Sequence, residues 1–124
     1  METILIKGNK ETPDVKFNFK EGHFSIQGRS LMENPLDFFT PIFSKTEEYF
    51  KKPNPLTNFE LKFEYMNSTS FKLVVDLLLL SKNLSTEGNQ IFVKWIYEAD
   101  DEDILMLGEE IARMTRLPFE YSPY

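Results

Sequence analysis

The sequence predicts an α/β domain in which a mixed β-sheet packs with about three principal helices. Residues 59–65 place an apolar side chain at every second position, which is the period of a strand with one buried face. The run 71–84 is apolar over a helical length, and 91–97 is rich in residues that favour strands. Strand, helix and strand in this order predict a parallel right-handed crossover. A chain of 124 residues is the size of one domain.

The N-terminal residues predict antiparallel strands. Residues 3–6 can form a short first strand, and 15–19 alternate apolar and polar side chains. A turn at 20–22 leads into 23–27, where apolar residues again fall on one face, so the pair is read as a hairpin. We interpret His23, which lies beside that turn, as a solvated residue rather than as a catalytic group or a ligand.

Two further helices are predicted, one before and one after the central strand-helix-strand unit in the sequence. Apolar residues at helical spacing predict the first between Leu36 and Phe50, and Pro41, which lacks an N–H group, places its regular start near Asp37. The last helix is predicted to bury the side chains of one face, and 117–121 ends it and allows an edge strand. The residues expected on that face are Ile104, Leu107, Ile111 and Met114.

The polar step 66–70 between the central strand and its helix is the candidate functional site. Phe59, Leu61, Phe63 and Tyr65 are expected on the buried face of the strand before it. Asn67 or Ser68 can cap the helix, whose start leaves N–H groups unpaired and carries a partial positive charge. An anion suits such a place, either in a ligand or as a phosphate on Ser68, Thr69 or Ser70. The same residue types cap ordinary helices, so chemistry alone leaves both interpretations open.

Two cations near this step are candidate phosphate contacts. Arg29 could hold a phosphate through two parallel hydrogen bonds, although an Arg after a strand is more often paired with a carboxylate. Lys72 follows Ser68 by four residues, so it could reach the start of the helix or pair with Asp76. The sequence does not choose between these roles.

An acidic run, formed by Glu98 and residues 100–103, precedes the last helix. Clustered carboxylates can bind a divalent metal, yet Asp and Glu also belong at a helix N-terminus, and we favour the capping role. The alternative is a small acidic hydrolase or metal-binding protein that uses Asp100 to Asp103, with Ser68 nearby. The chain has one His and no triad or metal-ligand spacing, so we expect no catalytic residues, no metal and no cofactor.

Composition excludes several classes of function. A net charge of −6 without a dense basic cluster argues against nucleic-acid binding. The absence of cysteine excludes disulfides and the usual zinc sites. The apolar run 73–80 is interrupted by Asp76 and is far shorter than the roughly 20 residues of a membrane span. We therefore expect a cytoplasmic protein with protein partners and no membrane insertion.

The stretch Tyr65-Met66-Asn67-Ser68-Thr69-Ser70-Phe71-Lys72 resembles the YxNTSSxK signature of the SiaC family of bacterial regulatory phosphoproteins, small relatives of the STAS anti-sigma-factor-antagonist fold. Other stretches match the same family in the same order. They are Glu11-Thr12-Pro13, Gly28-Arg29-Ser30, Glu33-Asn34-Pro35, Trp95-Ile96-Tyr97-Glu98 with Asp100-Asp101-Glu102, and Gly108-Glu109-Glu110. The resemblance covers nearly the whole chain and implies a single STAS-like domain over residues 1–124.

The resemblance also implies a function. SiaC-like proteins are partner switches that a dedicated kinase phosphorylates and a metal-dependent serine/threonine phosphatase dephosphorylates. The unphosphorylated form binds an effector, in the best-known setting a diguanylate cyclase that makes cyclic di-GMP and promotes biofilm growth. The family's acceptor is the Thr after the motif Asn, which falls here on Ser68. Because this sequence has Ser-Thr-Ser in place of Thr-Ser-Ser, Thr69 is the alternative acceptor, and Asn67, Ser70, Lys72 and Arg29 are candidate phosphate or partner contacts.

Overall fold

The computed structural model describes residues 2–124. Its elements, in order, are β1 (Ile4–Ile6), β2 (Asp14–Asn18), β3 (His23–Ser30), α1 (Leu36–Tyr49), β4 (Leu56–Met66), α2 (Ser68–Leu84), β5 (Gln90–Tyr97), α3 (Glu102–Thr115) and β6 (Phe119–Pro123). The strands form one sheet in the order β1-β2-β3-β4-β5-β6. Strands β1 to β3 pair antiparallel, and β3 to β6 pair parallel. The predicted mixed sheet, N-terminal hairpin, parallel crossover and C-terminal edge strand are confirmed.

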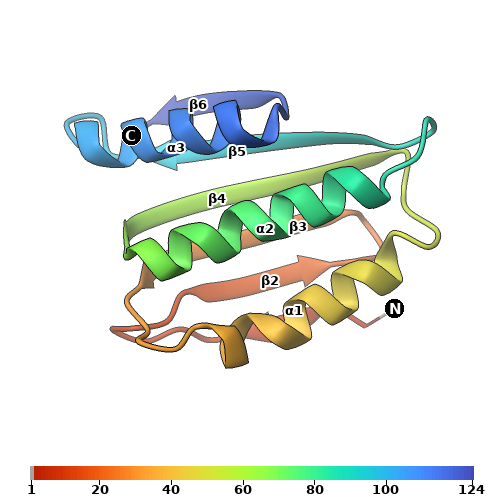
Figure 1. Ribbon diagram of the computed structural model, residues 1–124, viewed down its shortest axis with the longest axis horizontal. Helices are drawn as coiled ribbons and strands as arrows, with labels where there is room; N and C mark the ends of the chain where they lie inside the picture. The colour runs from red at the N-terminus through yellow and green to blue at the C-terminus, as the bar shows by residue number, and fades with distance from the viewer. Residues whose placement is uncertain (1) are drawn as a thin grey trace.

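All three helices lie on one side of the sheet (Figure 1). Each helix joins two neighbouring parallel strands, and the chain moves across the sheet in one direction from β3 to β6. Successive crossovers of one hand place their helices on the same face, because each helix must pack back in the same sense. The opposite face of the sheet is therefore left without helices, and its outward positions carry mainly polar side chains, such as Glu60 and Lys94.

The core lies between the sheet and the helices and is rich in aromatic side chains. The rings of Phe17 and Phe24 stack with centroids 4.6 Å apart, and Phe59 meets Phe24 edge to face at 5.2 Å. All three rings are at most 1% exposed. Such aromatic pairs stabilise a core by roughly 0.5–1.5 kcal/mol each beyond the area they bury. A single continuous core of this kind joins the sheet to α1 and α2.

Helix α3 is held by a close contact with β5. Trp95, which is fully buried, donates a hydrogen bond from Nε1 to the carbonyl oxygen of Ile104 at 3.0 Å. A Cβ atom on Gly108 would lie 2.5 Å from Trp95 Nε1, so only glycine allows the helix to approach the ring so closely. The prediction for Met114 is wrong, because the buried face follows Ile104, Gly108 and Ile111 and leaves Met114 51% exposed.

Two helix boundaries differ from the prediction. Helix α2 begins at Ser68, three residues before the apolar run starts, because the polar step itself forms the first turn. Helix α1 begins at Leu36 and contains Pro41 beyond its first turn. The missing N–H of Pro41 leaves the carbonyl of Asp37 without its helical donor, and because Asp37 is exposed, water can reach that oxygen. Thr40 Oγ1 donates to the Leu36 carbonyl at 2.7 Å in the same turn.

Among residues 2–124, no helix combines the length and the apolar character that crossing a membrane requires.

Candidate functional site

The polar step and the acidic run lie at the same edge of the sheet. Because β3, β4, β5 and β6 are parallel, their carboxyl ends share one edge. The step 66–70 follows β4 there, and the run 98–103 follows β5. In open α/β sheets, this is the edge at which ligands and partners are usually engaged, because loops and helix N-termini converge on it.

Asn67 is the residue that starts helix α2. Its backbone is extended, and its side-chain Oδ1 accepts hydrogen bonds from Ser70 N at 2.9 Å and from Thr69 Oγ1 at 3.1 Å. Its Nδ2 donates to the carbonyl oxygen of Met32 at 3.0 Å. Of the two caps that the sequence allowed, Asn67 is the one used, and Ser68 is the first residue of the helix.

The three hydroxyl groups of the step have different surroundings. Ser68 is exposed, and no side-chain hydrogen bond within residues 2–124 involves its hydroxyl. Thr69 is also exposed, but its hydroxyl donates to Asn67. Ser70 is fully buried and accepts a hydrogen bond from Ser30 Oγ at 2.7 Å. With respect to residues 2–124, Ser68 alone of the three has a hydroxyl that is both exposed and without a hydrogen-bond partner, whereas the hydroxyl of Ser70 is bonded inside the domain.

Hydrogen bonds join the start of α2 to two distant parts of the chain. Asn67 N donates to the Ser30 carbonyl at 3.0 Å, and Leu31 N donates to the Glu11 carbonyl at 2.8 Å. Together with the Ser30 to Ser70 bond, these contacts connect residue 11, the end of β3 and the first turn of α2. Three of the sequence stretches that carry the family resemblance thus meet at the candidate site.

A register shift at the end of β4 turns Tyr65 outward. Gly28 pairs with Phe63, but Arg29 pairs with Tyr65, so β4 contains one extra residue, Glu64. The prediction that Tyr65 shares the buried face is therefore wrong, because the bulge reverses the alternation beyond Phe63. Tyr65 is 51% exposed, and the next residue is buried in its place.

The structure puts the two candidate cations in different places. Ser30 faces the helices and contacts Ser70, so Arg29 beside it points to the uncovered face of the sheet, away from α2. Lys72 is exposed one turn after Ser68 on the same helix. Neither forms an ion pair within residues 2–124, and Asp76, which is partly buried, is not paired with Lys72 either.

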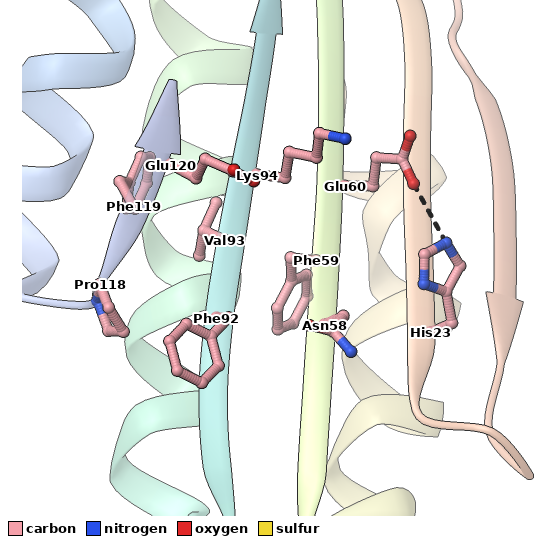
Figure 2. Close-up of a pocket in the computed structure, with 10 residues that line it drawn as sticks. All are labelled: His23, Asn58, Phe59, Glu60, Phe92, Val93, Lys94, Pro118, Phe119 and Glu120. Atoms are coloured by element: carbon pink, nitrogen blue, oxygen red, sulfur yellow. Dashed lines mark ion pairs between the residues drawn. The ribbon is translucent and has the colours of Figure 1, made fainter. Parts of the chain in front are cut away.

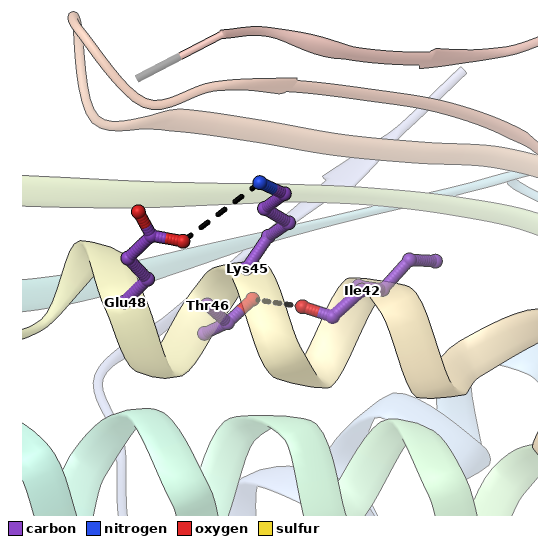
Figure 3. A network of polar contacts seen from close by, with 4 residues as sticks. All are labelled: Ile42, Lys45, Thr46 and Glu48. Atoms are coloured by element: carbon purple, nitrogen blue, oxygen red, sulfur yellow. Dashed lines mark hydrogen bonds and ion pairs between the residues drawn. The ribbon is translucent and has the colours of Figure 1, made fainter.

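The ion pairs of the described chain lie elsewhere. Lys45 and Glu48 are 3.8 Å apart on the exposed side of α1, whereas the buried Thr46 donates to the Ile42 carbonyl of the same helix (Figure 3). An exposed pair of this kind contributes at most about 1 kcal/mol. It supports α1 locally and does not belong to the candidate site.

In the acidic run, the capping interpretation is confirmed. Asp101 Oδ1 accepts a hydrogen bond from Ile104 N at 3.0 Å, and Glu102 and Asp103 lie in the first turn of α3. Partial burial, and then the negative charges of Glu98, Glu64 and Asp101, raise the pKa of Tyr124 at the end of the chain. Within residues 2–124, no three His, Asp or Glu side chains are grouped in a way that could hold a metal ion.

A hollow of about 620 Å³ lies on the uncovered face of the sheet, and sequence reasoning missed it (Figure 2). His23, predicted to be solvated, is half-exposed there and lies 3.2 Å from Glu60. Phe92 and Lys94 of β5 form another part of the lining. The hollow is near the amino ends of the strands, where β3 begins at His23. At some 3.3 Å per residue, the length of β3 separates it from the carboxyl edge by about 20 Å. It is therefore separate from the candidate site at Ser68.

Comparison with known proteins gives the same fold. The crystal structure of apo-SiaC from Pseudomonas aeruginosa superposes with a TM-score of 0.87 at 25% identity, covering 98% of this chain and 99% of that one. A chain in the crystal structure of the diguanylate cyclase SiaD in complex with its activator SiaC, from the same organism, gives a TM-score of 0.89 at 25% identity, covering 98% and 99%. The predicted α/β fold with a STAS-like arrangement agrees with these structures.

Sequence comparison leads to the family. A protein of Pseudomonas aeruginosa strain UCBPP-PA14 is 26% identical over 119 residues, which are 96% of this chain and 94% of that protein. Residues 6–124 match the model of the SiaC family regulatory phosphoproteins. This match includes the capped start of α2 with its three hydroxyl residues. The chain belongs to the SiaC family of regulatory phosphoproteins.

Proposed function

We propose that this protein is a partner switch in which reversible phosphorylation of Ser68 controls binding to an effector. The observation that carries the proposal is the exposed hydroxyl of Ser68, which has no hydrogen-bond partner within residues 2–124 and begins α2 in a family of regulatory phosphoproteins. A kinase needs a hydroxyl that it can reach and align, and Ser68 meets this need better than its neighbours. Thr69 is the second candidate, because its hydroxyl is accessible but already donates a hydrogen bond.

The fold can accept a phosphate at this position. A phosphoserine adds roughly −1.5 to −2 charges at neutral pH. The first turn of α2 has no acidic residue, so the positive end of the helix is free of competing carboxylates. Lys72, four residues further on, lies on the same side of the helix and can approach the phosphate. The modification should therefore change the surface while leaving the domain folded.

The partners follow from the family. In this proposal, a cognate serine/threonine kinase adds the phosphate, a metal-dependent serine/threonine phosphatase removes it, and all three proteins act in the cytoplasm. SiaC of Pseudomonas aeruginosa is the activator of a diguanylate cyclase, and its structure resembles this chain over nearly the full length. We therefore propose a diguanylate cyclase as the effector, bound by the unphosphorylated form in cyclic di-GMP and biofilm signalling. A surface complementary to a neutral hydroxyl cannot accept two negative charges without repulsion.

The proposal is tested by titrating three forms of the protein against the diguanylate cyclase encoded in the same genome. The forms are the unmodified protein, the phosphorylated protein with its site verified by mass spectrometry, and Ser68→Ala. We expect phosphorylation to weaken binding by about tenfold or more, which corresponds to about 1.4 kcal/mol. Ser68→Ala should bind like the unmodified protein and accept no phosphate at position 68, while Ser68→Asp should imitate the phosphate only in part. Equal binding of modified and unmodified protein, or a phosphate outside residues 68–70, would contradict the proposal.

A further inference from the structure

Asn67 makes more contacts than a helix cap requires. A cap needs one acceptor for a first-turn N–H group, which Oδ1 supplies to Ser70 N. The same oxygen also accepts the hydroxyl hydrogen bond of Thr69, and Nδ2 donates to the Met32 carbonyl. The backbone N–H of Asn67 is itself bonded to the Ser30 carbonyl.

These contacts fix the direction of the amide. If the side chain were flipped, Nδ2 would face the N–H group of Ser70, and Oδ1 would face the carbonyl oxygen of Met32. In the flipped orientation, one contact would therefore place a donor against a donor, and the other an acceptor against an acceptor. The amide oxygen is therefore held toward the first turn of α2, where the hydroxyl of Thr69 reaches it.

We infer that Asn67 is a positioning residue that determines which of the two exposed hydroxyls receives the phosphate. This inference rests on the proposed switch. In phosphoryl transfer, the hydroxyl oxygen attacks the γ-phosphorus of ATP, the bond to the ADP oxygen breaks, and the hydroxyl proton passes to a base of the kinase. The hydroxyl of Thr69 must first give up its bond to Asn67, whereas that of Ser68 has no such bond to another described residue.

The size of the preference follows from the value of one hydrogen bond. A net contribution near 1 kcal/mol corresponds to about a 3- to 10-fold bias against Thr69, because every 1.4 kcal/mol is a factor of ten. Ser70 does not enter the competition, since it is fully buried. Exposure alone would leave Ser68 and Thr69 nearly equivalent, so the bias comes from the amide oxygen.

Two substitutions separate this role from capping. Asn67→Gly removes the acceptor, and glycine is still tolerated at a cap position, where it ranks close to threonine. Asn67→Asp keeps an acceptor for both Ser70 N and the Thr69 hydroxyl but loses the donor to Met32. Each purified protein is incubated with ATP and a lysate of the cells that carry the gene, and fragmentation mass spectrometry gives the ratio of phosphate on Thr69 to phosphate on Ser68. The fluorescence of the buried Trp95 shows that each variant is folded.

We expect wild type and Asn67→Asp to carry the phosphate mainly on Ser68, and Asn67→Gly to raise the Thr69 to Ser68 ratio about 3- to 10-fold. A loss of stability alone would change the rate on both residues but not their ratio. An unchanged ratio in Asn67→Gly, or the same increase in Asn67→Asp, would overturn the inference while leaving the switch intact. A wild-type protein that receives no phosphate on any of these hydroxyls would refute the proposed function as well.

Discussion

The buried hydrogen bond between Ser30 and Ser70 should make these two residues energetically coupled. Both side chains are fully buried, and their Oγ atoms are 2.7 Å apart. Ser70→Ala leaves the Ser30 hydroxyl buried without its acceptor, and an unsatisfied buried group costs about 1–3 kcal/mol. Ser30→Ala should cost a similar amount. The double substitution removes both hydroxyls and loses only the net value of the bond, about 0.5–1.5 kcal/mol, so the single effects should not add.

The measurement is urea unfolding followed through the single, fully buried Trp95. Each kcal/mol lost should lower the urea midpoint by about 0.3–1 M, because the slope for small proteins is about 1–3 kcal/mol per M. Ser81→Ala is the matched control, because Ser81 is equally buried in the same helix but bonds only to the Leu77 carbonyl of its own helix, at 2.9 Å. We expect the control to cost less than about 1 kcal/mol, since it leaves no hydroxyl orphaned. Additive single effects, or equal losses for Ser70→Ala and Ser81→Ala, would refute the coupling.

Two more outcomes are expected. Gly108→Ala should destabilise the domain by about 1–2 kcal/mol in thermal unfolding, because overpacking against the indole of β5 outweighs the helix propensity of alanine. Gly88→Ala, whose Cβ would meet no atom within 4 Å, should stay within about 0.5 kcal/mol of wild type, and equal losses would show that the contact is not limiting. Calorimetry with magnesium, manganese or calcium should find no micromolar site in the acidic run, where Asp101 is occupied as a cap. Tight binding that disappears in Asp101→Asn, Asp103→Asn would instead support the metal-dependent hydrolase alternative.

The sequence was sufficient for the order and type of the elements because hydrophobic periodicity reports which face of a segment is buried. It failed for Tyr65, since reading alternation along β4 assumes an unbroken register, and the extra residue Glu64 becomes visible only when β3 is paired with β4. The same limit applies to Met114, because the close approach at Gly108 decides which side of α3 faces the sheet. Hydrophobic periodicity therefore predicted the helices and strands. The exposure of Tyr65 and Met114 depends instead on contacts between elements, which periodicity does not report.

The candidate site could be located from the sequence, but the roles of its residues could not be assigned. Ser, Thr and Asn beside an apolar run predict a capped helix start, and the resemblance to the family signature led us to propose this start as the switch. Which hydroxyl is exposed, bonded or buried depends on Ser30 and Met32, which lie more than 30 residues away in the chain. Spacing within residues 66–70 carries no information about such partners. The hollow beside His23 was not predicted for the same reason, because the residues that line it come from different strands.

The departure from the family signature can now be interpreted position by position. In the proposed switch, position 68 needs an exposed hydroxyl, which serine supplies as well as threonine does. Position 69 needs a hydroxyl that can reach Asn67, and the extra methyl group of Thr69 is accommodated because this residue is exposed. Position 70 is fully buried against Ser30, where the small side chain of serine fits and a larger one would overpack the contact. The exchange of Ser and Thr at the first two positions therefore keeps a hydroxyl in each of these surroundings, and we expect the hydrogen bond between position 69 and Asn67, rather than the residue type, to determine the acceptor.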